Sequence, residues 1–164
     1  MLNNMQLMKI SKNGIELIKK SEGCKLYAYR DCVGVLTIGY GHTKNVRAGQ
    51  AITQNQADAF LEQDLEPVEK QLNGMNINFK QNQFDALCSW IINLGSGNFN
   101  SSTLKKRIVE KASDEEIAAQ IVRWVYAGGK VQKGLKKRRV EEANMFVGYA
   151  LYGFDNNGNI TKKK

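Results

Sequence analysis

The chain has 164 residues, 42% of them hydrophobic, which is enough for one domain with a sizeable core and at most two lobes. One proline and 15 glycines argue against a disordered chain, and no apolar run reaches the length of about 18 residues that spans a membrane. The formal net charge of +8 favours anionic partners, namely nucleic acid, a membrane surface or the bacterial envelope, without choosing among them.

The chain has an odd number of cysteines, Cys24, Cys32 and Cys88, and its first ten residues lack the features of a signal peptide. Together these observations predict reduced thiols in a cytosolic setting. The cysteine spacing matches no zinc site and His42 is the only histidine, so we expect neither a metal ion nor another cofactor. For Cys32, a redox-sensitive thiol is a hypothesis beside the simpler role of a small packing residue.

After a loosely ordered lead-in over residues 1–10, the first predicted helix covers residues 11–21. Ser11 is its expected N-cap, and Gly23 takes the left-handed position that ends a helix. Ile18 lies four positions before Glu22, so both share a face that we expect to be buried. Burial and the negative end of the helix dipole both favour a neutral carboxylic acid at Glu22, as a general acid requires. An exposed glutamate at a frayed helix end is the alternative.

Two short segments rich in aromatic and β-branched residues, 27–31 and 35–38, flank Gly34 and predict a β-hairpin. With the turn centred on Gly34, Asp31 falls opposite Thr37, with their Cβ atoms about 5 Å apart on one face. A carboxylate and a hydroxyl placed in this way can hold one water molecule between them. A polar pair on a solvated face is the alternative.

Glu22, Asp31 and Thr37 together fit glycoside hydrolysis with inversion, which needs an acid on the leaving oxygen and a water on the opposite face of the sugar. Their order and spacing resemble the catalytic triad of the phage-type lysozymes, glycoside hydrolase family 24. The surrounding letters, EGCKLYAYRD followed by GVLTIGYGHT, are similar to the signature of that family.

This resemblance implies an endolysin that hydrolyses the β-1,4 bond between N-acetylmuramic acid and N-acetylglucosamine in peptidoglycan. It further implies that the protein accumulates in the host cytoplasm and reaches the wall after a separate protein permeabilises the membrane. We expect a monomer whose partner is peptidoglycan and not nucleic acid. A lysozyme fold that binds wall polymers without cleaving them is a further hypothesis, which the intact triad disfavours.

The implied fold is a mainly helical α+β fold with two lobes in a single domain over residues 1–164. A small antiparallel sheet lies in the N-terminal lobe, a long helix connects the lobes, and the C-terminal lobe is helical. The expected bounds are 22–60 for the sheet-bearing lobe, 53–72 for the connecting helix, 75–150 with helix 11–21 for the helical lobe, and 153–164 for a flexible polar tail.

A capping box at Thr53 opens the predicted connecting helix, in which Pro67 is expected to introduce a kink. Asp64 lies on this helix and is the expected partner of His42. A histidine just past a strand more often forms such a structural pair, and a catalytic role for His42 is the alternative.

Further helices are predicted over residues 80–94, 103–112, 113–126 and 134–147. The segment from Asn93 to Leu104 resembles a second motif of the family. Asn93, Ser102 and Thr103 within it can hydrogen-bond sugar hydroxyls or N-acetyl groups, and they can equally serve as caps and turn formers.

A basic run from Lys133 to Arg139 opens the last predicted helix. This pattern is typical of a solvated basic face, and a surface that grips nucleic acid is the competing hypothesis. The family carries a similar Leu-x-x-Arg-Arg-x-x-Glu element, which implies that Arg138 or Arg139 reaches the substrate cleft and acts on Glu22 by charge. Of the two we prefer Arg138.

Overall fold

The computed structural model describes residues 6–127 and 129–163. Residues 1–5 of the expected lead-in and Lys164 of the expected tail lie outside this part of the chain. Within it, the helices are α1 (Lys12–Glu22), α2 (Gln54–Asn73), α3 (Gln81–Leu94), α4 (Ser96–Ser101), α5 (Thr103–Val109), α6 (Asp114–Ile121) and α7 (Lys133–Val147). The strands form antiparallel pairs: β1 (Lys25–Arg30) with β2 (Leu36–Gly39), β3 (Tyr126–Ala127) with β4 (Lys130–Val131), and β5 (Tyr152–Phe154) with β6 (Ile160–Lys162).

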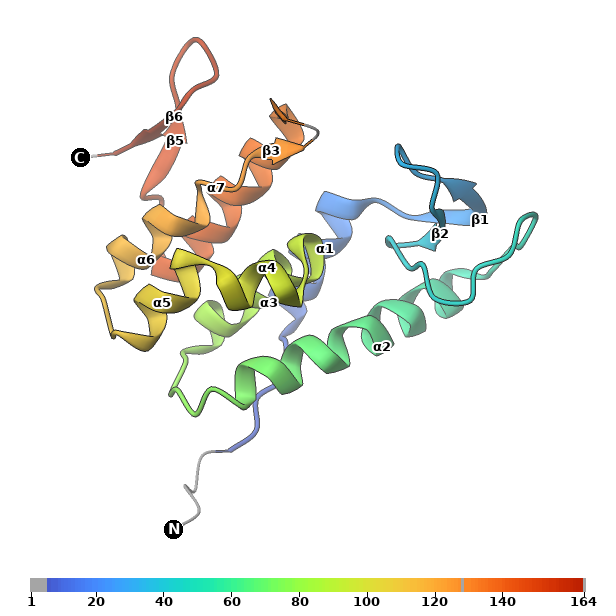
Figure 1. The fold of residues 1–164 in the computed structure, drawn as a ribbon, viewed down its shortest axis with the longest axis horizontal. Coiled ribbons are helices and arrows are strands. Elements are labelled where there is room, and N and C mark those ends of the chain that lie inside the picture. The colour runs from blue at the N-terminus through green and yellow to red at the C-terminus, as the bar shows by residue number, and fades with distance from the viewer. Residues whose placement is uncertain (1–5, 128, 164) are drawn as a thin grey trace.

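The predicted α+β fold class, mainly helical and two-lobed, is confirmed (Figure 1). The β1–β2 hairpin packs over a small core made by Ile38, Ile52 and Ala57. The larger core lies in the helical lobe around α3, where Phe84 and Trp90 are fully buried. Figure 1 shows α2 running from beneath the hairpin to the helical lobe, so this one helix contributes to both cores.

The start of α2 follows from local chemistry. The Thr53 side chain accepts a hydrogen bond from the Gln56 amide and the Gln56 side chain accepts one from the Thr53 amide, which confirms the predicted capping box. Leu61 and Leu65 point from α2 into the helical core. Pro67 lies inside the helix, which continues to Asn73.

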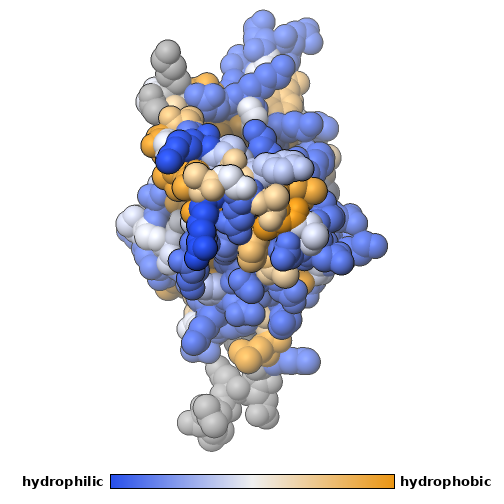
Figure 2. All heavy atoms as spheres, turned by 90° about the vertical axis from the view of Figure 1, so that its right-hand side faces the viewer, coloured by the Kyte–Doolittle hydropathy of each residue, from blue (hydrophilic) through white to orange (hydrophobic). Residues whose placement is uncertain are grey.

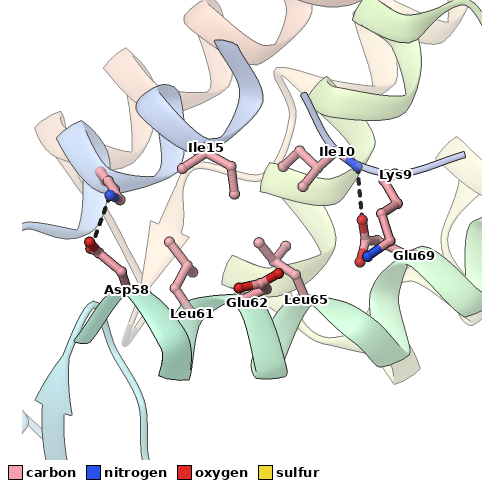
Figure 3. A pocket seen from close by; sticks show the side chains of 9 residues that line it. Lys9, Ile10, Ile15, Asp58, Leu61, Glu62, Leu65 and Glu69 are labelled. Atoms are coloured by element: carbon pink, nitrogen blue, oxygen red, sulfur yellow. Dashed lines mark hydrogen bonds and ion pairs between the residues drawn. The ribbon is translucent and has the colours of Figure 1, made fainter. Parts of the chain in front are cut away.

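The segment before α1 is held more firmly than expected. The Ile10 amide donates to Oε2 of Glu69 at 2.8 Å, and Lys19 on α1 pairs with Asp58 at 3.0 Å. Figure 3 shows these two contacts at opposite ends of a hollow between α1 and α2 whose lining includes Leu61. Hydrogen bonds to side chains of α2 therefore order residues that we expected to be loose.

Ser11 occupies the N-cap position of α1, as predicted, but it does not cap the helix through its side chain. Its side chain makes no capping hydrogen bond; instead, the Ser11 amide and hydroxyl both donate to the Asp85 carboxylate of α3. Since its hydroxyl binds Asp85, Ser11 connects the start of α1 to α3.

The helix predicted over residues 113–126 is shorter than expected. Its capping box at Ser113 is present, but α6 ends at Ile121, and residues 126–131 form the β3–β4 hairpin. Trp124 packs edge-to-face on Trp90, with ring centroids 5.2 Å apart, so the chain leaves the helix to place this side chain against the core.

The expected flexible tail is also wrong over its described part, because β5 and β6 pair there as a hairpin. The Asp155 carboxylate accepts hydrogen bonds from the amides of Asn157 and Asn159 and so closes the turn. Tyr152 is buried, and its amide donates to the Asn144 side chain at 2.8 Å. A buried aromatic anchor and a side-chain-stabilised turn thus order a polar segment.

Candidate functional site

Glu22 is the last residue of α1, so its carboxylate projects where the helix gives way to β1. The following residue, Gly23, ends the helix with φ at 68° and ψ at 163°, a conformation that only glycine adopts without strain. Ile18 on the same helix is fully buried, whereas a quarter of the Glu22 side chain stays exposed. The helix therefore presents Glu22 at the edge of the core, where it is open to a ligand.

The expected apolar surroundings of Glu22 are wrong, because an arginine contacts it. Nη1 of Arg138 donates to Oε1 of Glu22 at 2.6 Å, which brings together two residues 116 positions apart. The arginine is 5% exposed, so solvent screens this pair far less than a surface ion pair. Of the two candidates, Arg138 is the one that contacts Glu22.

The loop after β2 encloses Glu22 from another side. A Cβ atom added to Gly41 would lie 3.3 Å from Oε2 of Glu22, and Gly41 adopts a φ of +81°. Both the backbone angle and the close approach favour glycine at this position. One carboxylate oxygen of Glu22 therefore accepts a hydrogen bond from Arg138, and the other faces the backbone at Gly41.

The predicted register of the β1–β2 hairpin is wrong by two residues. Thr37 lies opposite Tyr29, and the Asp31 amide donates to the Val35 carbonyl at 3.0 Å. The turn is tighter than expected because Oδ1 of Asp31 accepts hydrogen bonds from the amides of both Val33 and Val35. Since the shift is an even number, Asp31 and Thr37 stay on one face as diagonal neighbours, which are typically about 7 Å apart.

The hydrogen bonds of Asp31 and Thr37 decide which of their oxygen atoms can bind a water molecule. Oδ1 of Asp31 is occupied by the two turn amides, while Oδ2 accepts no hydrogen bond from the described residues. The hydroxyl of Thr37 donates to the Val35 carbonyl at 2.9 Å, and the residue is buried. Oδ2 of Asp31 is thus available to accept a hydrogen bond from a water molecule beside the turn.

Tyr29 is a residue of this site that the sequence analysis missed. Burial raises the pKa of its hydroxyl, and the charges of Glu22 and Asp31 raise it further. The ammonium group of Lys25 sits 4.3 Å from the ring centroid. Tyr29 could have been found from the hairpin, since it lies two positions before Asp31 and therefore on the same face.

The structure pairs His42 with Asp64. Nδ1 of the imidazole lies 2.9 Å from one carboxylate oxygen and 3.0 Å from the other. The His42 ring is 5% exposed and stacks on Phe60 at a centroid distance of 4.2 Å. These contacts tie the loop after β2, which carries Gly41, to α2.

The three candidates for sugar binding, Asn93, Ser102 and Thr103, differ in exposure and in hydrogen bonding. Ser102 is buried and caps α5, donating to the Phe99 carbonyl and accepting from the Lys105 amide, so its hydroxyl is committed within the chain. Thr103 is exposed at the start of α5. Asn93 is half-buried, and its side-chain oxygen accepts from Arg139 at 2.5 Å. Ser102 is thus a capping residue, and Thr103 is the most accessible of the three.

We expected the run from Lys133 to Arg139 to form a solvated basic face, and this expectation is wrong for the two arginines of the run. Arg138 and Arg139 are buried, and both lie beside Glu142, which is itself fully buried. Burial raises the pKa of the Glu142 carboxyl and lowers that of the Arg139 guanidinium, and their attraction opposes both shifts. The spacing of Arg138 and Glu142, four residues apart on one helix, was the signal that could have revealed this network.

Comparison with known proteins identifies the family of the chain. The sequence model of the family described as phage lysozyme matches residues 19–142. The endolysin of Acyrthosiphon pisum secondary endosymbiont phage 1 is 41% identical over 144 residues, which cover 85% of this chain and 98% of that endolysin. The solved muramidase domain of SpmX from Asticaccaulis excentricus has a TM-score of 0.79 and 37% identity, covering 85% of this chain and 97% of that domain.

A second solved structure, an endolysin from Escherichia coli O157:H7 phage FAHEc1, has a TM-score of 0.78 and 34% identity, with 87% of this chain and 95% of that one covered. The chain therefore belongs to the phage lysozyme family. Across the described residues, no helix combines the length and apolarity needed to cross a bilayer.

Proposed function

We propose that this phage lysozyme is an endolysin in which Glu22 is the general acid and Asp31 with Thr37 positions the attacking water. The bond cleaved is the β-1,4 linkage between N-acetylmuramic acid and N-acetylglucosamine in peptidoglycan. The observation that carries the assignment is the enclosure of the Glu22 carboxylate by Arg138 and by Gly41, which closely follows the hairpin that bears Asp31.

The proposed reaction is a single displacement with inversion. Glu22 transfers its proton to the glycosidic oxygen as the bond from that oxygen to the anomeric carbon breaks. The water oxygen bonds to the anomeric carbon from the opposite face, and Asp31 accepts the proton that the water loses. Support comes from the Oδ2 atom of Asp31, which is open to water while Oδ1 is anchored by the turn. Proton NMR of the first-formed anomer tests the inversion.

Five further residues complete the proposed site. Thr103 and Asn93 are proposed to contact the glycan, Thr103 through its exposed hydroxyl. Arg138 acts on the substrate through Glu22, and the pair of His42 with Asp64 holds the loop that carries Gly41.

The remaining aspects of function concern partners and location. We propose a monomer that acts on the wall, accumulates in the host cytoplasm and is released by a separate permeabilising protein. The net charge of +8 suits an anionic envelope. Nucleic acid is not proposed as a partner, because burial of Arg138 and Arg139 removes two cations from the basic run.

The decisive experiment compares wild type with Glu22→Gln in clearing outer-membrane-stripped Gram-negative cells, followed by reduction and analysis of the product sugars. We expect muramic acid reducing ends from wild type and a loss of rate of roughly 10²–10⁴-fold in the variant, because positioned acid catalysis is removed. Glu16→Gln, on the exposed side of the same helix, is the matched control and should clear cells at the wild-type rate. Equal clearing by wild type and Glu22→Gln would refute the assignment.

A further inference from the structure

Arg138 is held by several groups besides Glu22. Its Nη2 donates to the carbonyl of Ser89 at 3.1 Å, and its Nε donates to Oε2 of Glu142 at 3.3 Å. A guanidinium carries its N–H groups in one rigid plane, so contacts along one edge fix the direction of the opposite edge. The edge fixed in this way carries Nη1, the atom that contacts Glu22.

Glu142 is in turn oriented by its own partners. The Ser89 hydroxyl donates to Oε2 of Glu142 at 2.5 Å, and Nε of Arg139 lies 2.9 Å from Oε1. The carboxylate is completely buried between α3 and α7, where water cannot replace a lost partner. The position of this carboxylate is therefore set by the packing of two helices.

We infer that Glu142, together with Ser89, is a positioning residue for the hydrolysis: it fixes Arg138 and through it the orientation of the Glu22 carboxylate. This inference rests on the proposed role of Glu22 as the acid. If Glu142 had no positioning role, it would only compensate the buried charges of Arg138 and Arg139. Its loss would then lower stability without changing the turnover of folded enzyme.

A double-mutant cycle separates the two roles. We would measure kcat, KM and the pH profile of kcat on soluble uncrosslinked glycan chains for Glu142→Gln, Arg138→Gln and the double variant, normalised to folded protein by circular dichroism. Since a misplaced catalytic group can cost up to about 10²-fold, we expect Glu142→Gln to lower kcat by about tenfold or more with KM within about twofold of wild type. In the Arg138→Gln background the same change should leave kcat and the pH profile unaltered.

Two further variants keep the test decisive if Glu142→Gln folds poorly. Ser89→Ala removes only the hydroxyl that orients Glu142 and leaves the Ser89 carbonyl for Arg138, so it should lower kcat in the same direction. Glu69→Gln is the matched control, because Glu69 is also buried but binds the Ile10 amide, away from Arg138. It should lower stability and leave kcat unchanged.

Arg138, which contacts Glu22, and the ionisable groups of Arg139, Tyr29 and Asp31 are all retained in Ser89→Ala. A changed pH profile in that variant therefore reports geometry and not a removed charge. Equal loss of kcat from Glu142→Gln in both backgrounds, or wild-type kcat in Ser89→Ala, would overturn the inference. Failure of the proposed function would look different, because Glu22→Gln would then remain active.

Discussion

Arg138 on α7 reaches Glu22 at the end of α1, with 2.6 Å between Nη1 and Oε1. The contact joins α7 to α1 and lies beside Gly41, which closely follows β2 of the hairpin. Because Arg138 is buried and also bound to Ser89 and Glu142, this contact belongs to a fixed network and not to a mobile surface pair. Its loss should therefore affect activity more than a surface ion pair would.

Replacing Arg138 with lysine tests the geometry of this network with the charge retained. A lysine has one point charge and cannot reach Glu22, the Ser89 carbonyl and Glu142 together. We expect a loss of about 1–3 kcal/mol in the free energy of unfolding, because buried acceptors lose their donors, and a clear loss of lytic rate. Urea unfolding and cell clearing measure the two effects.

The matched control is Arg107→Lys, at an exposed ion pair with Glu110 on α5. Surface pairs contribute about 0–1 kcal/mol, so this variant should stay close to wild type in both assays. Equal behaviour of the two variants would show that the Arg138 contacts are as weak as surface contacts.

Replacing Gly41 with alanine tests how closely the loop after β2 must approach Glu22. The added Cβ would lie 3.3 Å from Oε2 of Glu22 and would sit at a φ of +81°, which non-glycine residues rarely adopt. We expect lower stability, by about 1 kcal/mol from the backbone strain alone, and a loss of activity larger than the unfolded fraction explains. Gly49→Ala is the control, since its φ is +79° but no atom lies within 4 Å of its added Cβ. Full activity in Gly41→Ala would mean that the loop yields without moving the carboxylate.

How much of the site could be predicted depends on how local its chemistry is. Glu22, Asp31 and Thr37 lie within one short stretch, so residue types, order and spacing were enough to single them out. The register of the hairpin was missed because the side chain of Asp31 tightens the turn, a contact that β propensity does not describe. The sequence pattern therefore predicted correctly that Asp31 and Thr37 share a face of the hairpin, but it predicted the wrong residue directly opposite Thr37.

Long-range packing was the part that sequence patterns described poorly. A run such as that from Lys133 to Arg139 is usually solvated, yet two of its arginines are buried, because Glu142 on the same helix and Ser89 on α3 provide partners. The tail was misjudged for a related reason. Its residues are polar, and contacts such as those of Tyr152 with Asn144 and of Lys162 with Glu115 anchor it to the helical lobe.

The three cysteines should differ in reactivity with a disulfide reagent in the native protein. Cys32 is exposed and Cys24 is half-buried, whereas Cys88 lies in the core. Burial, followed by the charges of Glu69 and Asp85, raises the pKa of the Cys88 thiol well above its usual range and suppresses the reactive thiolate. We expect fast labelling of Cys32, slower labelling of Cys24, and labelling of Cys88 only on unfolding, as followed by mass spectrometry of peptides. Early labelling of Cys88 would show that the core around α3 opens readily.

The β5–β6 hairpin should lose order in acid because of Asp155. Hydrogen bonds from Asn159 and Asn157 hold the pKa of the Asp155 carboxyl below that of a free aspartate, which is about 3.9. A carboxyl whose pKa is lowered in the folded state stabilises that state above its unfolded pKa, and the contribution fades as the pH falls through the lower, folded value. We therefore expect cross-strand NMR contacts between Gly153 and Thr161 to persist at pH 5 and weaken below about pH 4.

The Asp155→Asn variant provides the control for this titration. An asparagine can accept the same turn hydrogen bonds through its amide oxygen but does not titrate, so its hairpin should show no change over the same acidic range. Loss of the cross-strand contacts at the same pH in both proteins would assign the acid transition to another group. The variant keeps the two backbone hydrogen bonds to Oδ1 and loses the one from the Asn159 side chain to Oδ2, a loss that does not depend on pH in the variant. A pH-dependent difference between the two curves therefore reports the titration of Asp155.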